Sequence, residues 1–466
     1  MSVPHLPARP LRHLCSGPVP LVLALLAALA PSAAALQSGD VAVRAGRVIL
    51  ADGREIENGT VLVRGGKITA VGGADLEIPF DVVLHEHPDA VVFSGFKVAY
   101  TTSGLDRANE NVPVGPFLDV RDSLDPSQLY FEEERRNGVV AIGVMQGTST
   151  VIAGLGRVVA PHGMTVGDMT LRAPLGHVMS FAPRSGNSRS AQMAELREAE
   201  AGLLDFLRRK GQELVDGAAA LADAERAGED PANDPPPLDG ASRNPGFVRF
   251  GADFPGKGEI AEADLPEPQR SLVRIFNGDR DLWVWAPTAT DVVHANDWLS
   301  THGLLARGVF LIDGDAWKAS AVLAAAGRPV VLAGDLWHVE RDPVTWKEIK
   351  TFVPKVLADA GIAFSLTPQG GLMDADRLAY LGAVCVREGV PRATALAAVT
   401  SNPAAAWKLA ASLGGIAAGA DGTFAVLSGD PLDPNHKVLE VWLRGERIYE
   451  RSTDERLQRL LEGTLQ

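Results

Sequence analysis

The chain has 466 residues, 46% of them hydrophobic, which is enough apolar material for one large domain and a smaller one around a sizeable core. Lysine and arginine together number 44 and aspartate and glutamate 58, so the formal net charge is -14 at pH 7. This acidic balance, with no run of basic residues, argues against nucleic acid or an anionic membrane as the partner.

The first 35 residues have the layout of a secretory signal peptide. Arg9 and Arg12 precede an apolar run at 21–30, and small residues follow at 32–35. A membrane anchor is the alternative, but this run is too short to cross a bilayer, and no later window is apolar enough. We therefore expect an exported protein, periplasmic or extracellular, without a membrane span.

Residues 41–72 alternate short β-branched runs with Gly-containing turns at Asn58-Gly59 and Gly65-Gly66. This pattern predicts consecutive β-hairpins. The segment His85-Glu86-His87 follows, and it is the one His-x-His of the sequence. It ends in Pro88-Asp89, so we interpret it as a solvated turn rather than a metal site.

From 91 to 417, short apolar strands alternate with amphipathic helical stretches. The strand sequences are VVFSGFKVAY, GVVAIGVM, DLWVWAP, GVFLIDG, RPVVLAG and IAFSLTP. The alternation predicts an α/β fold with right-handed β-α-β units and a parallel sheet, either closed or doubly wound. Because no Gly-rich phosphate fingerprint follows the first strand, a TIM-type (β/α)8 barrel is favoured.

An insertion at 185–270 interrupts this alternation. Its first half predicts a long helix or helical pair, with one apolar face formed by leucines near heptad spacing. These leucines are Leu196, Leu203, Leu207, Leu214 and Leu221. The face is expected to pack on the protein's own barrel, with a partner surface as the alternative, and the second half is a Pro- and Asp-rich loop.

The C-terminal stretches GTFAVLSGDP and VLEVWLRGERIYE repeat the strand and turn pattern of the N-terminal hairpins. Chain ends often lie close together. We therefore expect a small β-sandwich domain composed of residues 36–90 and 418–450, followed by a tail helix at 451–466.

These stretches resemble the amidohydrolase superfamily, in particular its imidazolonepropionase-like and dipeptidase-like members. The matching segments are DGREIENGTVLVRGGKITAVG, VVFSGF, ERRNGVVAIGVMQGTSTVIAGLGRVV, ALAAVTSNPAAAWKL, LGGIAAGADGTFAVLSGDPLD and VWLRGERIYE. The resemblance implies a barrel that holds a divalent metal, usually zinc. The family's ligands are a His-x-His pair on strand one, histidines after strands five and six, and an aspartate after strand eight. Bound zinc lowers the pKa of water from about 15.7 to about 7.

The corresponding positions here carry other side chains. They are Tyr100 and Thr102 for the pair, Trp285 for strand five, Asp313 for strand six, and Pro368 or its neighbour Gln369 for strand eight. A phenol and a hydroxyl are poor zinc ligands, and tryptophan and proline offer no usable lone pair. We therefore expect no metal cofactor, with Asp313 the single remaining candidate ligand.

Further pocket candidates are His177, in a predicted loop after an early strand, and Gln369. Together with Tyr100, Trp285 and Trp337 they suggest an aromatic barrel mouth with a few polar groups, which suits a small ligand.

Two functions from different classes are favoured, and a purely structural exported module is a third, so the sequence leaves it undecided whether the protein is an enzyme. In the first, the metal ligands of an amidohydrolase have been replaced. The protein is then a pseudoenzyme that binds a small molecule or serves as a partner subunit, as a homodimer or with an intact amidohydrolase. In the alternative, it is an active hydrolase of carbon–nitrogen bonds, acting on a cyclic amide or dipeptide. That alternative uses a rearranged metal site, for example Asp313 with His177, or works without metal.

Overall fold

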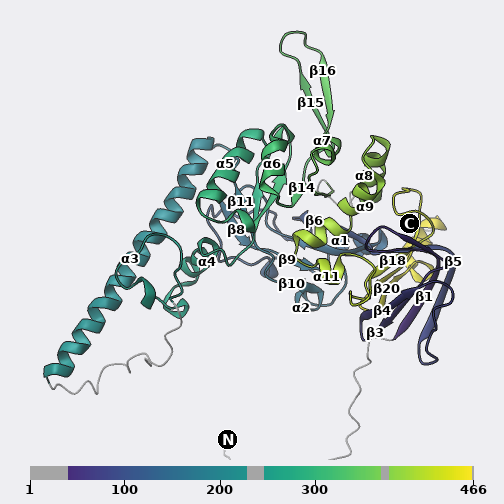
Figure 1. Ribbon diagram of the computed structural model, residues 1–466, viewed down its shortest axis with the longest axis horizontal. Coiled ribbons are helices and arrows are strands. Elements are labelled where there is room, and N and C mark those ends of the chain that lie inside the picture. The colour runs from purple at the N-terminus through teal and green to yellow at the C-terminus, as the bar shows by residue number, and fades with distance from the viewer. Residues whose placement is uncertain (1–39, 228–245, 369–376, 464–466) are drawn as a thin grey trace, which may run out of the picture. The chain divides into compact units, whose positions relative to one another are not determined.

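The computed structural model describes residues 40–227, 246–368 and 377–463, and its fold is α/β, as predicted (Figure 1). The predicted signal peptide at 1–35 lies outside the described residues. So do Gln369 and most of the Pro- and Asp-rich loop, at 228–245. Within the described ranges, no helix combines the length and the apolar character that crossing a bilayer requires.

Strands from both ends of the chain form one eight-stranded sheet, in which the purple and yellow strands of Figure 1 meet. Its order is β20-β19-β18-β5-β1-β3-β4, and β2 pairs with β1. The strands are β1 (Val41–Ile49), β2 (Glu55–Glu57), β3 (Thr60–Arg64), β4 (Lys67–Gly72), β5 (Val83–Phe93), β18 (Phe424–Leu427), β19 (Val438–Leu443) and β20 (Glu446–Glu450). The pairing defines a single sheet, so the sandwich of two sheets stays a prediction.

The turns of this sheet follow from local sequence. Strands β3 and β4 pair antiparallel across Gly65-Gly66, where both residues have positive φ, 55° and 76°. Glycine adopts this backbone without a Cβ clash, so the dipeptide permits the tight turn. The apolar side chains that β3 buries, including Val61 and Val63, pack with Phe424 of β18 in one core cluster.

The expected strand at 91–100 is two strands that belong to different sheets. Strand β5 ends at Phe93, and β6 (Phe96–Thr101) begins after Ser94-Gly95. Gly95 has φ 70°, and a Cβ there would lie 2.3 Å from Val140 Cγ1. A glycine is therefore required at the point where the chain leaves one sheet and enters the next.

The middle of the chain forms two further sheets. One has the order β10-β9-β7-β6 and the other β17-β14-β13-β12-β11-β8. Their strands are β7 (Val139–Val144), β8 (Ile152–Leu155), β9 (Arg157–Val159), β10 (Thr170–Arg172), β11 (His177–Ser180), β12 (Leu282–Trp285), β13 (Gly308–Ile312), β14 (Val330–Leu332) and β17 (Phe364–Leu366). The predicted parallel pairing is present between β6 and β7 and along β11-β12-β13-β14-β17. Strand β8 pairs antiparallel with β11, and β9 pairs antiparallel with β7. Among the described residues the ladders do not close into one ring, so the closed barrel stays a prediction.

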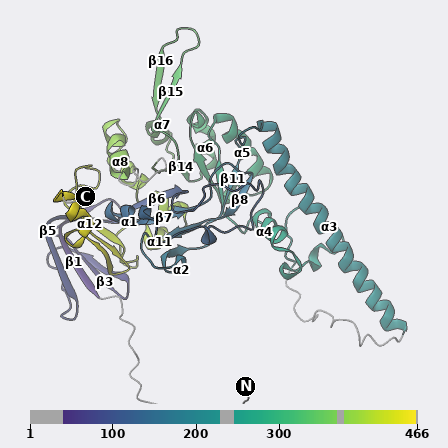
Figure 2. The ribbon, with the colours of Figure 1, turned by 180° about the vertical axis from the view of Figure 1, so that it is seen from behind.

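Helices connect these strands, as Figure 2 shows from the opposite side. They are α1 (Leu129–Arg136), α2 (Val166–Met169), α4 (Glu267–Phe276), α5 (Ala289–Thr301), α6 (Ser320–Ala326), α7 (Val353–Asp359), α8 (Arg377–Arg387), α9 (Arg392–Ala398), α10 (Ser401–Ala406), α11 (Ala410–Leu413) and α12 (Glu455–Leu461). Helix α12 lies in the C-terminal tail.

The first half of the insertion is one long helix, α3 (Arg189–Ala227). Leu196, Leu203 and Leu207 are buried in the main core, whereas Leu221 is 43% exposed. The predicted apolar face therefore packs on the protein over the first part of the helix and leaves the core toward its C-terminus.

A two-stranded sheet follows β14, and it was not predicted from the sequence. It consists of β15 (Trp337–Arg341) and β16 (Glu348–Phe352), which pair antiparallel. Trp337 is 38% exposed and lies against Phe352 with ring centroids 4.9 Å apart. Trp337 therefore lies on a partly exposed hairpin after β14, and its place among the aromatic residues of the barrel mouth stays a prediction.

Candidate functional site

The carboxyl ends of the parallel strands form one edge, and the register fixes which residues meet there. Ser180, the last residue of β11, pairs with Trp285, the last residue of β12, and Trp285 pairs with Leu311 of β13. Asp313 directly follows β13, and Pro368 stands two residues beyond β17. Ligand sites of α/β proteins lie at this edge, so it is the candidate site.

Tyr100, the penultimate residue of β6, is buried and bonded to the main chain around it. Its hydroxyl donates to the Gln146 carbonyl at 3.1 Å, and its own carbonyl accepts from Thr367 Oγ1 at 2.5 Å. These bonds join β6 to the segment after β7 and to the end of β17. Burial raises the pKa of the Tyr100 phenol, which therefore stays protonated and neutral.

Trp285 and Thr102 are half-buried. The Trp285 ring packs against the core cluster that contains Tyr100, together with Met145 and Leu311. The structure thus brings two of the predicted positions, Tyr100 and Trp285, to one apolar cluster at the strand ends.

Asp313 is half-buried, and its Oδ1 accepts a hydrogen bond from the Gly314 amide at 2.6 Å. A Cβ on Gly334 would lie 1.6 Å from that same oxygen, so the glycine makes room for the carboxylate beside the end of β14. Pro368, also half-buried, contributes no side-chain donor or acceptor.

These positions do not fit the zinc that the resemblance implies. Structural and catalytic zinc sites draw three or four ligands from Cys, His, Asp and Glu. Of the five positions, Asp313 alone carries such a group. In residues 40–227, 246–368 and 377–463, no group of three or more His, Cys, Asp and Glu side chains could hold a metal ion.

His177 lies away from the site, which corrects its predicted place in a loop. It is the first residue of β11, at the amino end, and it pairs with Leu282 at the start of β12. Its ring Nδ1 donates to the Ala153 carbonyl at 3.0 Å. Burial lowers the pKa of His177 to about 4, so the ring is neutral at pH 7 and part of the core.

The segment His85-Glu86-His87 is part of strand β5, so its interpretation as a turn was wrong. His87 Nε2 lies 3.2 Å from the buried Glu440 carboxylate, and the His85 ring packs edge-on against Trp442 at 5.0 Å. Burial opposes ionisation of Glu440, yet hydrogen bonds from His87, Arg447 and Trp442 lower its pKa to about 2. This histidine pair belongs to the sheet built from the chain ends.

Three further residues near the site were not predicted from the sequence. Thr367 links β17 to β6, and Gln146 Oε1 accepts from the Gly154 amide at 2.7 Å. Trp407, just after α10, is buried and donates from Nε1 to the Ala99 carbonyl at 3.0 Å. Thr367 directly precedes Pro368, which is the signal that could have drawn attention to it.

The comparisons with known proteins agree with this architecture. The profile described as "Amidohydrolase family" matches residues 292–449. The crystal structure of an amidohydrolase from Thermotoga maritima MSB8 is similar, with a TM-score of 0.70 and 21% identity, over 88% of this chain and 100% of that one. The predicted resemblance to the amidohydrolase superfamily is thereby confirmed over residues 292–449, and the likeness to the solved structure concerns the fold.

Two other solved structures are more distant. A zinc-bound adenosine deaminase from Xanthomonas campestris has a TM-score of 0.48 and 16% identity, over 91% of this chain and 97% of that one. A prolidase complexed with N-methylphosphonate-L-proline has a TM-score of 0.49 and 15% identity, over 88% and 100%. The chain matches no curated protein.

Proposed function

We propose that the protein is a hydrolase that acts on a carbon–nitrogen bond of a small cyclic amide or dipeptide, at the carboxyl edge of the parallel strands. The observation that carries this proposal is the match of residues 292–449 to the amidohydrolase profile, because this segment includes Asp313, Pro368 and strands β13, β14 and β17. Asp313 is the acid–base group at this edge, and a carboxylate so placed can take a proton from an attacking water.

The proposal includes a closed (β/α)8 barrel. The bond from Thr367 Oγ1 to the Tyr100 carbonyl supports closure, because it joins the last parallel strand, β17, to the first, β6. We also propose that the protein acts after export, in the periplasm or outside the cell. The signal-peptide pattern at 1–35 supports this localisation.

A second candidate function is favoured by the poor fit of the site to zinc. Tyr100, Thr102, Trp285 and Pro368 supply aromatic and apolar surface where the family has metal ligands. Such a site suits a protein that binds a small ligand without turnover. In this case the chain is a binding protein or a partner subunit.

The experiment measures hydrolysis of a panel of dipeptides and cyclic amides by the purified protein, alongside its zinc content. For a hydrolase, turnover is expected to fall at least tenfold in Asp313→Ala and to persist in Asp315→Ala. The latter is the matched control, since Asp315 Oδ1 accepts from the Ala289 amide at 3.1 Å. Saturable quenching of tryptophan fluorescence by a panel compound, without turnover, would instead establish the binding protein. Turnover that survives both Asp313→Ala and a chelator contradicts the hydrolase proposal.

A further inference from the structure

Strands β15 and β16 expose apolar side chains and two strand edges. Among the described residues they pair with each other alone, and Figure 1 shows them extending as a separate ribbon beyond β14 and α7. Val339 is 50% exposed and Ile349 43%, and in the connecting turn Val344 is 84% and Trp346 74% exposed. A two-stranded sheet is only marginally stable in water, and an exposed edge is a template for pairing with another strand.

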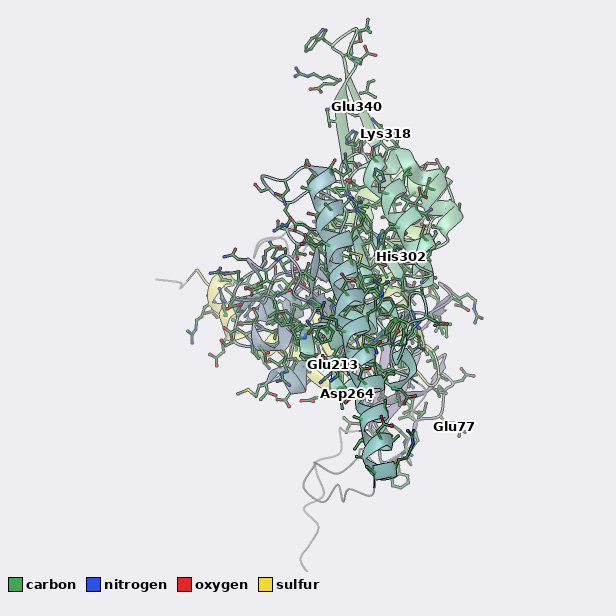
Figure 3. The ribbon with its side chains drawn as sticks, turned by 90° about the vertical axis from the view of Figure 1, so that its left-hand side faces the viewer. Glu77, Glu213, Asp264, His302, Lys318 and Glu340 are labelled. Atoms are coloured by element: carbon green, nitrogen blue, oxygen red, sulfur yellow. The ribbon has the colours of Figure 1, made fainter. Side chains whose placement is uncertain are left out.

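One face of this hairpin contacts residues Trp317 and Lys318 near the base of the hairpin. Glu340 forms an ion pair with Lys318, and Figure 3 shows the two residues near each other where the hairpin meets the helices. The His338 ring lies edge-on to Trp317, with centroids 5.9 Å apart. Side chains alternate along a strand, so Trp337, Val339 and Arg341 lie on the opposite face, and all three are exposed.

The hydrogen-bond pattern shows which backbone groups of β15 point outward. The Asp342 amide donates to the Lys347 carbonyl, and the Val353 amide to the Leu336 carbonyl, each at 2.9 Å. In an antiparallel ladder every second residue bonds to the partner strand. The amides and carbonyls of Trp337, Val339 and Arg341 are therefore directed away from β16, to the outer edge.

We propose that a second copy of this chain pairs with β15 along this edge, antiparallel, about a two-fold axis at Val339. Val339 then faces Val339 of the second copy, and both exchange amide-to-carbonyl bonds. Trp337 lies opposite Arg341 of the second copy, a cation–π pair, and His338 lies opposite Glu340 of the second copy, whose carboxylate can accept a hydrogen bond from the imidazole. A two-fold contact must be self-complementary, and this strand meets that requirement.

Charge disfavours two other arrangements. Pairing through the outer edge of β16 about its central outward residue, Lys350, would place Lys350 opposite itself. Pairing of β15 about Glu340 would place two carboxylates opposite each other. Like charges directly opposed in a sheet are destabilising, so the Val339 register is favoured over these two.

The test is the mass of the purified protein in solution by sedimentation velocity, at tens of micromolar. The wild type is expected at twice the chain mass of 49.2 kDa. Val339→Asp and Val339→Lys each place like charges across the axis, and each is expected to be a monomer. Mixed in equal amounts, the two variants are expected to recover the dimer, since opposite charges then meet. A monomeric wild type overturns the proposal, as does a mixture that stays monomeric.

Two proline variants provide matched controls for the edge itself. Neither Val339 nor the opposing Lys350 uses its amide within the hairpin, so proline at either position preserves the β15–β16 ladder. Val339→Pro is expected to abolish the dimer and Lys350→Pro to retain it, with equal thermal unfolding midpoints. Retention of the dimer in Val339→Pro contradicts pairing through β15.

Discussion

At the scale of single residues, His177 shows how strongly burial controls charge. The residue is 1% exposed, and its ring Nδ1 bonds to the Ala153 carbonyl rather than to a carboxylate. The folded protein therefore holds the ring neutral, with a pKa of about 4 against an ordinary value of 6.5. Because the folded pKa is depressed, the stability from this residue is present above pH 6.5 and lost as pH falls through 4.

The prediction concerns the free energy of unfolding of wild type and His177→Phe, measured by urea denaturation at pH 7 and pH 4. Between these two pH values the free energy of unfolding of the wild type is expected to fall by about 3 kcal/mol more than that of the variant. The reason is that unfolded wild type binds a proton at His177 as the pH falls, whereas phenylalanine cannot. His294, which is exposed, provides the control: His294→Gln should lose as much as the wild type. Equal losses in wild type and His177→Phe would show that this histidine can be protonated in the folded protein.

The site residues that could be predicted from sequence are those set by strand ends. Trp285 ends one apolar run of strand length and Asp313 directly follows another, so their place at the carboxyl edge could be predicted from the local pattern. The contacts of Tyr100 were not, because its partners Gln146 and Thr367 are distant in sequence. His177 was misplaced, since a short strand beginning after Gly176 has no local signal that separates it from a loop.

At the scale of elements, helix α3 divides into a buried part and an exposed part. Leu207 is 0% exposed, and Leu221, two heptads further on, is 43% exposed. The periodicity of the leucines predicted the helix and its apolar face. It could not show where the face leaves the core, because that depends on contacts of α3 with α4 and with residues Lys257–Glu259, which are distant in sequence. The β15–β16 hairpin was not predicted, because the alternation of strands and helices predicts a helix directly after β14.

This division gives a matched pair of substitutions on one helix. Leu207→Ala is expected to lower the free energy of unfolding by about 2–5 kcal/mol, through lost transfer energy and the cavity left behind. Leu221→Ala is expected to change it by less than about 0.5 kcal/mol. Urea denaturation followed by circular dichroism measures both. A loss at Leu221 as large as at Leu207 would show that the exposed end of the helix is covered by a partner.

At the scale of the whole molecule, strands from the N-terminal and C-terminal parts of the described chain form one sheet. Strand β5 pairs in parallel with β1 and antiparallel with β18, so it lies between N-terminal and C-terminal strands. The core of this sheet combines residues from both ends, with Val43 and Val61 beside Phe424 and Trp442. The periodic strand patterns at both ends were visible in the sequence, but the order β18-β5-β1 was not, because pairing between distant strands leaves no local signature.

The last prediction tests by truncation whether the fold depends on this sheet. Removal of residues 424–463 takes away β18, β19 and β20, exposes the edge of β5 and opens the apolar cluster, so cooperative thermal unfolding is expected to be lost. Removal of 455–463 is the control, since α12 contains no buried residue and Asp454, which bonds Arg136 at 2.6 Å, is kept. This shorter truncation is expected to unfold cooperatively within a few degrees of the wild-type midpoint, as followed by near-ultraviolet circular dichroism. A cooperative transition in the longer truncation would mean that the parallel strands and their helices fold without the sheet, and that the chain ends add a separable unit to a self-sufficient core.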